Sequence, residues 1–385
     1  MISLVELTNF KCFQCQSFDL KKITLLTGLN SAGKSSFIQS LLLLRQSYYQ
    51  DLLPDIGLAL NGDLVSIGTA QDALFEGAEE EKIVFKIVWK NGEEGTWSLK
   101  YPQVSDVKCD RVSDVKYDRE SDVLRLDSPP TQSKIYDASL YGDAFHYLMA
   151  ERIGPRPFFE TSDFQVRQRG QIGSRGEYAA HFLSVYRDKN IPNPILSHPK
   201  AESLSLIEQV RAWIGEVSPG TRIERKLSPD MGLVSLQFSY GLSNPYRATN
   251  VGFGLTYTLP ILLVILASPP GTLILIENPE AHLHPKGQSR MGYLLALAAS
   301  CDVQIVLETH SDHVLNGIRL AVHGGKIKPE DVGINFFQRI DENDQTFTQI
   351  VSPRIDRNGR IDQWPDGFFD EWDKSLDVLL EPAQE

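Results

Sequence analysis

Apolar and polar positions follow one another along this chain in patterns that predict both strands and helices. Short apolar runs bounded by turn residues predict strands at 23–26, 82–89, 96–101, 272–276 and 303–307. Helical spacing of apolar residues predicts helices at 35–48 and 202–216, and hairpins are expected at 2–20 and 222–238. Strands interleaved with helices in this order favour an α/β fold.

A phosphate-binding loop joins the first predicted strand–helix pair. The segment from Gly28 to Ser35 fits the pattern G-x-x-x-x-G-K-[ST]. Its glycines let backbone N–H groups turn toward phosphate oxygens, and the helix adds its positive N-terminus. Lys34 is long enough to reach the β- and γ-phosphates, and the Ser35 hydroxyl suits an octahedral Mg²⁺. The expected nucleotide-binding residues of the loop are Gly28, Asn30, Ser31, Ala32, Gly33, Lys34, Ser35 and Ser36. The sequence therefore predicts binding of a nucleoside triphosphate with Mg²⁺.

Two later apolar runs end in acidic and histidine side chains. The run 272–276 leads into Glu277, and the run 303–307 leads into a segment that contains His310. Open α/β sheets bind ligands beyond the carboxyl ends of their strands. We therefore expect Glu277 on the metal side of the nucleotide and His310 close to it.

The charge of the chain argues against a broadly basic nucleic-acid-binding protein. At 385 residues the chain is long enough for two domains or one elaborated one, and its formal net charge is −12. Positive charge is concentrated at Arg152, Arg156, Arg167, Arg169 and Arg175. These side chains suit phosphate, DNA backbone or an acidic protein surface, but ordinary ion pairing in loops explains them as well. Nucleic-acid binding is therefore left open.

No membrane-spanning segment or secretory leader is indicated. The most apolar run, 255–267, is too short to cross a bilayer and contains Pro260. No charged region followed by an apolar one opens the chain. We expect a cytoplasmic protein that does not associate with membranes.

Cysteine and histidine patterns do not favour a dedicated metal site. Cys12 and Cys15 have suitable spacing, but Cys109 and Cys301 are far apart and supply no second pair. His282 and His284 lie close to acidic residues, although ligand number and geometry cannot be inferred from their spacing. We expect neither a transition-metal cluster nor a disulfide.

An eight-residue repeat occupies 105–123 and begins each time with Ser-Asp-Val. Its period is too short for the usual solenoid units, and its mixed charges are typical of a solvated surface insert. A specific recognition role is the alternative.

Five segments in order make the chain similar to ABC-class ATPases, in particular to their RecF, SMC and OLD-like branch. These segments are 9–13, 28–35, 250–256, 277–285 and 308–311. The stretch 356–371 also resembles the tail of a compact bacterial subgroup that is often associated with phage defence. The resemblance implies an ABC-type P-loop fold with a mixed core sheet, an antiparallel β subdomain and a helical signature lobe.

The same resemblance implies four segments. Residues 1–100 would form the N-terminal part of the ATPase core, and residues 101–249 an inserted region with the repeat, the Arg-rich loop and a helical and hairpin lobe. Residues 250–345 would complete the core, and residues 346–385 would form a C-terminal tail domain.

Individual roles follow from the resemblance as well. Lys11 would lie near the base or phosphates of ATP, and Gln71 is the candidate for the glutamine that links the metal to lobe motion. The signature segment would consist of Gly252, Gly254 and Thr256, and would pack on the γ-phosphate held by the other subunit. Glu277 would stand on the metal side, and His310 would be the switch histidine.

One departure concerns hydrolysis. Relatives carry an Asp-Glu pair where this chain has Glu277 and Asn278. The second residue of that pair normally orients the attacking water, and Asn cannot act as a general base. Glu280 would substitute if the turn at Pro279 brings it inward; otherwise Asn278 and His310 position the water and hydrolysis is slow.

The resemblance implies an ATP-driven switch that acts as a homodimer or higher oligomer. Its output would be control of a separate effector, such as a nuclease or toxin, in phage defence or DNA maintenance. The alternative is a clamp or scaffold that binds ATP but barely cleaves it. A transporter motor is disfavoured because no L-S-G-G-Q-like signature is present, and no long heptad segment indicates an SMC rod.

Overall fold

The computed structural model describes residues 1–53, 55–102, 118–128, 130, 133–241, 243–342 and 345–381. The chain divides into a first unit, Met1–Lys21, Gly28–Gly142 and Phe337–Val351, and a second unit, Lys22–Thr27, Asp143–Phe336 and Ser352–Glu385. Most of the octapeptide repeat, 105–117, lies outside the described residues, and Cys109 lies there too.

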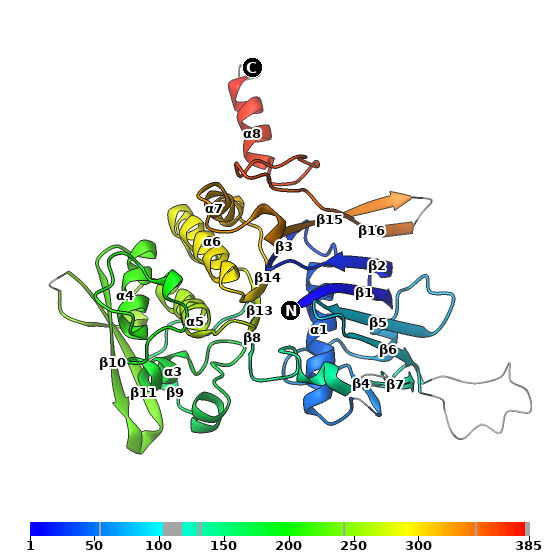
Figure 1. Cartoon of the computed structure of the whole chain (residues 1–385), viewed down its shortest axis with the longest axis horizontal. Coiled ribbons are helices and arrows are strands. Elements are labelled where there is room, and N and C mark those ends of the chain that lie inside the picture. Colours follow the sequence, from blue (N-terminus) through cyan, green and yellow to red (C-terminus); the bar gives the residue numbers. More distant parts are fainter. Residues whose placement is uncertain are drawn as a thin grey trace, which may run out of the picture. The chain divides into compact units, whose positions relative to one another are not determined.

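The first unit contains a six-stranded antiparallel sheet (Figure 1). In spatial order its strands are β2 (Phe13–Asp19), β1 (Ile2–Phe10), β5 (Lys82–Trp89), β6 (Glu94–Lys100), β7 (Val123–Ser128) and β4 (Gly57–Ala59). Every second residue of β5 is buried, as its alternating sequence requires. Helix α1 (Lys34–Tyr49) packs against this sheet, and the rings of Phe18 and Phe37 lie 4.4 Å apart. The expected strands at 82–89 and 96–101 correspond to β5 and β6 of this sheet.

The second unit is built on parallel strands that are buried on both faces. Its order is β3 (Ile23–Gly28), β14 (Gln304–Glu308), β13 (Leu273–Glu277) and β8 (Phe145–Leu148). Strand β15 (Val332–Glu342) follows on the other side of β3. From Phe337 on, β15 and its partner β16 (Gln345–Val351) belong to the first unit. Continuous apolar runs such as 273–276 are what strands covered on both faces require.

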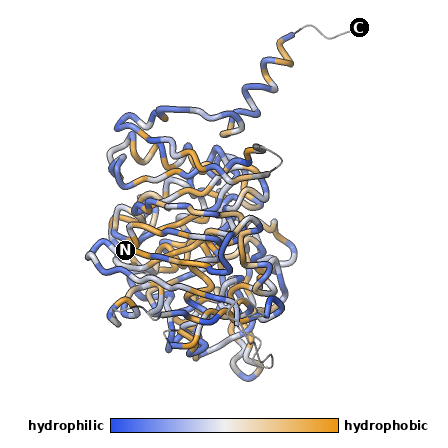
Figure 2. Tube along the Cα trace, turned by 90° about the vertical axis from the view of Figure 1, so that its right-hand side faces the viewer, coloured by the Kyte–Doolittle hydropathy of each residue, from blue (hydrophilic) through white to orange (hydrophobic). Residues whose placement is uncertain are grey.

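Helices of the second unit surround this sheet and a smaller one. Five of these helices are α3 (Ala179–Tyr186), α4 (Leu206–Val217), α5 (Phe253–Ala267), α6 (Pro285–Ser300) and α7 (Asp312–His323). A sixth, α8 (Glu371–Leu380), is exposed along its whole length. The smaller sheet pairs β10 (Thr221–Ser228) with β11 (Leu233–Tyr240), and adds the short strands β9 (Phe159–Glu160) and β12 (Tyr246–Arg247). Figure 2 shows hydrophobic and hydrophilic positions interspersed along the trace. None of the helices in the described part of the chain combines the length and the apolar character needed to cross a membrane.

Helices α6 and α7 approach each other closely at two glycines. A Cβ added to Gly292 would lie 2.1 Å from the Val314 carbonyl oxygen, and one added to Gly317 would lie 2.0 Å from that of Ser289. Because both obstacles are backbone atoms, a methyl group there must push the helices apart.

Replacing Gly317 by alanine is therefore expected to destabilise the protein by about 2–4 kcal/mol. Gly215 in α4 is the matched control, since its Cβ would meet nothing within 4 Å. Gly215→Ala should be neutral or stabilise by roughly 0.5–1 kcal/mol. Thermal unfolding of both variants measures the difference, and equal midpoints would contradict the close helix contact.

Candidate functional site

The phosphate loop adopts the backbone conformation that its glycines permit. Gly28 has a φ of 130° and Gly33 a φ of 109°, values that residues with side chains rarely adopt. Lys34 is buried, and its ammonium donates to the carbonyl oxygens of Gly28 (3.0 Å) and Leu29 (2.7 Å). Gly33 precedes α1 and supplies no side-chain cap, so the first N–H groups of this helix suit an anion. Asn30, Ser31 and Ser35 are exposed in the same segment, Ser36 is half-buried and Ala32 is buried.

Strands β15 and β16 form a wall beside the phosphate loop. The Leu29 N–H donates to the Phe337 carbonyl oxygen at 3.3 Å, and the Thr348 hydroxyl donates to that of Ala32 at 3.2 Å. A Cβ on Gly28 would lie 2.0 Å from the Phe337 oxygen. The first glycine is thus needed for close approach to β15 as well as for its positive φ. No sequence signal marked Phe337 or Thr348.

Lys11 and Gln71 belong to segments that touch in the first unit. The Lys11 N–H donates to the carbonyl oxygen of Ala73, in the short helix α2 (Ala70–Ala73) that also carries Gln71. The Lys11 ammonium donates to Gln39 at 2.9 Å, and burial lowers the pKa of Lys11. The Cys12 sulfur packs so closely that a Cβ on Gly33 would lie 2.6 Å from it. The turn that carries Lys11 therefore lies against the phosphate loop, whereas the Gln71 side chain is exposed.

The parallel strands of the second unit end in register. Glu277 of β13 pairs with Glu308 of β14, which in turn pairs with Leu26 of β3, two residues before the phosphate loop. The pairing continues beyond the strands, because the Asn278 N–H donates to the Glu308 carbonyl oxygen at 2.9 Å. The carboxyl edge of this sheet thus carries the acids expected from the sequence, at the edge where open α/β sheets bind ligands.

The Glu277 carboxylate is held by two donors from the neighbouring strand β8 and its continuation. The Tyr147 hydroxyl donates to Oε1 at 2.9 Å, and the Ala150 N–H donates to Oε2 at 3.0 Å. Burial, followed by the charge of Glu277, raises the pKa of Tyr147 above its ordinary value. The tyrosine therefore remains a donor and fixes the carboxylate. Sequence analysis did not identify Tyr147, whose short strand carries no motif.

Arg152 fixes the turn after Glu277 through backbone carbonyl groups. Its guanidinium donates to the carbonyl oxygens of Met149 (3.1 Å), Glu277 (2.7 Å) and Asn278 (2.6 Å). It is 1% exposed, so it is not part of a surface patch. Burial lowers the pKa of Arg152 to about 10, which leaves it charged at neutral pH.

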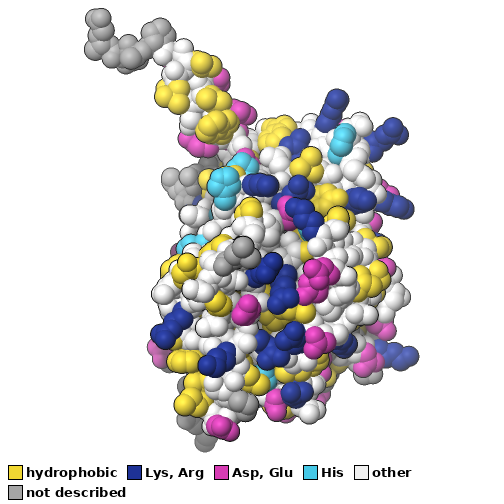
Figure 3. Space-filling view, turned by 90° about the vertical axis from the view of Figure 1, so that its left-hand side faces the viewer, with side chains coloured by type: hydrophobic (Ala, Val, Ile, Leu, Met, Phe, Trp, Pro, Cys, Tyr) yellow, Lys and Arg dark blue, Asp and Glu magenta, His cyan; other side chains and the backbone are white. Residues whose placement is uncertain are grey.

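The other arginines considered from the sequence are largely paired. Arg167 contacts Asp163, Arg169 contacts Asp143 and Arg175 contacts Glu151. Figure 3 shows a face on which Lys and Arg side chains stand among acidic and apolar ones. Ordinary ion pairing, the alternative left open from the sequence, accounts for these three arginines, and Arg152 is buried.

The turn from Asn278 to Glu280 is fixed in an unusual conformation. Asn278 has a φ of 45°, which asparagine tolerates better than most residues. Both Glu280 oxygens accept hydrogen bonds at 2.8 Å, one from the Thr309 hydroxyl and one from the His310 N–H. Glu280 therefore ties the turn after β13 to the segment after β14, and His310 is exposed beside it.

The signature segment forms the first turn of α5. Gly252 is the exposed N-cap residue, with no side-chain cap and open space where a Cβ would stand. A Cβ on Gly254 would lie 2.6 Å from the His282 carbonyl oxygen, and the Thr256 hydroxyl donates to the carbonyl oxygen of Phe253 at 3.0 Å.

The next turn of α5 contacts both Arg152 and His282. The Tyr257 ring lies 4.6 Å from the His282 ring and beneath the Arg152 guanidinium at 5.3 Å. Within the second unit, α5, which we call the signature helix, thus contacts both Arg152 and the turn after Glu277. Across the described residues, no group of three or more His, Cys, Asp or Glu side chains forms a metal cluster.

Three family models match the chain. One described as "AAA ATPase domain" matches residues 1–137. One described as "AAA domain, putative AbiEii toxin, Type IV TA system" matches residues 124–316, and one described as "Protein of unknown function (DUF3696)" matches residues 327–379. Among curated proteins, none matches the sequence.

Solved structures of SMC head domains resemble the chain over nearly its whole length. An SMC head bound to the C-winged-helix domain of ScpA is 13% identical, with a TM-score of 0.52 over 91% of this chain and 97% of that one. An Smc head with an extended coiled coil, bound to the C-terminal domain of ScpA derived from Pyrococcus furiosus, is 12% identical, with a TM-score of 0.51 over 99% of both chains. An Smc head from Pyrococcus yayanosii is 11% identical, with a TM-score of 0.51 over 91% of this chain and 97% of that one. These likenesses confirm the predicted α/β fold of the ABC type.

Proposed function

Because the chain belongs to the family described as "AAA domain, putative AbiEii toxin, Type IV TA system", and is therefore a P-loop ATPase, we propose that it is an ATP-driven conformational switch. In this proposal two chains dimerise around Mg²⁺-ATP in the cytoplasm and control a separate effector protein. Residues 1–100 and 250–345 supply the ATPase core, with 101–249 inserted and 346–385 as a tail. ATP binding favours the closed pair, and hydrolysis or release reopens it.

The observation that carries the proposal is the open N-terminus of α5. Gly252 leaves the first amides of this helix without a side-chain cap and without a covering group at its Cβ position. A helix N-terminus of this kind attracts a phosphate group. We propose that it receives the γ-phosphate of the ATP held by the partner chain, with Gly254 and Thr256 shaping the turn.

The remaining roles divide between the phosphate loop and the edge of the parallel sheet. Lys34 and the N-terminal amides of α1 would hold the phosphates, and Lys11 would lie near the base or phosphates. The Mg²⁺ ion would be held by Ser35 and Glu277. Gln71 would link the Mg²⁺ ion to the motion of the lobe. His310 would sense the γ-phosphate. Mg²⁺ would supply charge neutralisation between the phosphates.

Slow hydrolysis is supported by the turn at 278–280. Asn278 lacks a carboxylate, and both Glu280 oxygens already accept hydrogen bonds from Thr309 and His310. We therefore propose that Glu280 positions His310 and does not take the proton of the attacking water. The second candidate, an ATP-dependent clamp that barely cleaves ATP, rests on the same observation.

Control of an effector is supported by two of the comparisons. The description of the matching family names a toxin of a type IV toxin–antitoxin system, and two of the similar SMC heads are bound to domains of ScpA. We propose that the effector here is a separate nuclease or other toxin, in anti-phage defence or DNA maintenance.

Mixing two inactive variants tests the shared site. Lys34→Ala removes the phosphate-loop ammonium, and Gly252→Asp adds a negative charge where the structure has open space. Aspartate is a favourable N-cap, so α5 should remain folded. Each variant should lack ATP turnover on its own. An equal mixture should recover about a quarter of wild-type turnover, because roughly half of random dimers are mixed and each has one intact site.

Gly215→Asp is the matched control, since Gly215, like Gly252, lacks a positive φ and has nothing within 4 Å of its Cβ position. It should keep wild-type turnover. If both single variants fold and bind each other but no mixture recovers activity, the shared site is contradicted.

A further inference from the structure

A pocket of about 450 Å³ lies in the second unit, and neither Glu277 nor Tyr147 lines it. It opens near the amino ends of the parallel strands, since Ala144 precedes β8 and Thr272 precedes β13. Glu277 and Tyr147 lie toward the carboxyl ends of the same two strands. The size falls within the range of small-molecule sites.

The lining of the pocket combines an apolar floor with cationic groups. Ile172, Phe182, Leu263 and Val264 contribute apolar side chains, and all four are buried. Arg169 and Lys189 also line the pocket. An apolar floor with few polar groups is the usual composition of a ligand site.

The two cations differ in their partners. Arg169 is 27% exposed and contacts the Asp143 carboxylate at 3.1 Å, so its charge is largely balanced. The Lys189 ammonium stands 5.5 Å from the Tyr186 ring centre. Within the part of the chain that the structure describes, no carboxylate lies within ion-pair distance of Lys189. The pocket therefore offers one positive charge beside an aromatic ring and an apolar floor.

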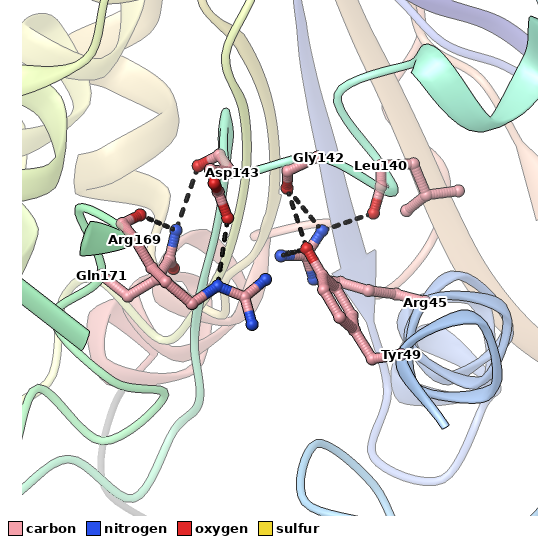
Figure 4. A network of polar contacts seen from close by, with 7 residues as sticks. All are labelled: Arg45, Tyr49, Leu140, Gly142, Asp143, Arg169 and Gln171. Atoms are coloured by element: carbon pink, nitrogen blue, oxygen red, sulfur yellow. Dashed lines mark hydrogen bonds and ion pairs between the residues drawn. The ribbon is translucent and has the colours of Figure 1, made fainter. Parts of the chain in front are cut away.

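Hydrogen bonds between distant segments fix the walls. The Leu206 N–H donates to the Lys189 carbonyl oxygen at 2.9 Å, which ties the loop after α3 to the start of α4. The Asn193 side chain donates to the Ser268 carbonyl oxygen at 2.9 Å, which ties the same loop to the end of α5. Figure 4 shows Asp143 held by Arg169 and by Gln171, whose amide donates to the Asp143 carbonyl oxygen at 3.0 Å. The pocket is thus preformed, which reduces the entropic cost of binding.

We propose that this pocket binds a small amphipathic organic anion, with its apolar body on the floor and its acidic group beside Lys189. The ligand regulates the ATPase through the elements that line the pocket. Leu263 and Val264 lie near the end of α5, roughly 15 Å along the helix from Gly254. Strands β8 and β13 lead from the pocket to Tyr147 and Glu277. A ligand that alters the packing of these elements changes the signature turn and the metal-side carboxylate together.

Fluorescence titration with anilinonaphthalene sulfonate, an apolar aromatic anion, tests the site in the full chain. Saturable binding at one site per chain is expected. Lys189→Glu should weaken it about tenfold, because it replaces attraction by repulsion of the sulfonate. Val264→Phe should abolish it by filling the pocket, while thermal unfolding confirms that the variant is folded. Lys326→Glu, an exposed lysine that does not line the pocket, should bind as the wild type does.

Wild-type affinity in both Lys189→Glu and Val264→Phe, or no saturable binding to the wild-type chain, overturns the pocket assignment. The proposed regulation of the ATPase by the pocket ligand is tested by a separate measurement. A non-hydrolysable ATP analogue with Mg²⁺ should change the dissociation constant of the probe, because coupling between two sites is reciprocal. An unchanged constant at saturating analogue overturns the regulation and leaves the pocket assignment standing. The binding arm requires no ATP turnover, so it is independent of the proposed switch.

Discussion

Replacing Glu277 by glutamine is expected to lower ATP turnover by about 10²–10³-fold while ATP binding is nearly retained. The loss follows from the missing negative charge on the metal side of the phosphates. The fold should survive, because the glutamine oxygen still accepts from the Ala150 N–H, and the Tyr147 hydroxyl is able to accept from the new amide. Steady-state turnover and calorimetric titration with a non-hydrolysable ATP analogue separate the two effects.

Two companion variants make the result specific to Glu277. Tyr147→Phe removes one of its two donors and should lower turnover about three- to tenfold. Glu280→Gln should lower turnover by no more than about tenfold, because the amide oxygen still accepts from the His310 N–H. A loss in Glu280→Gln as large as that in Glu277→Gln would instead make Glu280 the carboxylate that activates the water.

Replacing Arg152 by methionine is expected to remove about 2–4 kcal/mol of stability and to lower turnover roughly 10–100-fold. Methionine fills similar space without a donor, so the carbonyl oxygens of Glu277 and Asn278 lose their hydrogen bonds in a buried environment. The turn that carries the metal-side carboxylate then loses its fixed position. The contact with Tyr257 disappears too, which leaves His282 as the link between the signature helix and that turn. Thermal unfolding and ATP turnover measure the two losses.

Arg152→Lys separates charge from geometry. A lysine keeps the positive charge but has no planar fork to reach three carbonyl groups, so it should not restore turnover. Arg156→Met is the control, because Arg156 is exposed only four residues later. Turnover near the wild-type level in Arg152→Met, in a chain shown to be folded, would contradict the positioning role.

The predicted α/β fold is confirmed because its signals are local. The phosphate loop, the buried run before Glu277 and the run before Glu308 are each complete within a few residues of sequence, and flanking turns mark where they end. Local patterns of this kind identify strands and helices even when the elements that pack against them in the fold are unknown. The assigned roles of Lys34, Glu277 and His310 stay predictions that the experiments above test.

The groups that hold the site were not predictable in the same way. Tyr147 reaches Glu277 across 130 positions of sequence, and Thr348 reaches Ala32 across 316. Such pairs depend on strand order, since β8 lies beside β13 only in the folded sheet. Arg152 shows the same limit, because nothing in a loop rich in charge distinguishes a buried arginine from solvated ones. Which arginine is buried, and which carboxylate pairs with each of the others, is decided only when the chain folds.

The wall formed by β15 has a consequence for how this protein is divided into parts. The family model of unknown function begins at residue 327, before β15, and would make everything beyond it a separable module. Yet Phe337 of β15 and Thr348 of β16 hydrogen-bond to the phosphate loop, and a Cβ on Gly28 would collide with Phe337. A chain shortened at that boundary would lose two strands that hydrogen-bond to its phosphate loop. Deletion mapping would then report ATPase loss for a segment in which no catalytic residue is proposed. A protein that displaced β15 or β16 would accordingly disturb the phosphate loop itself.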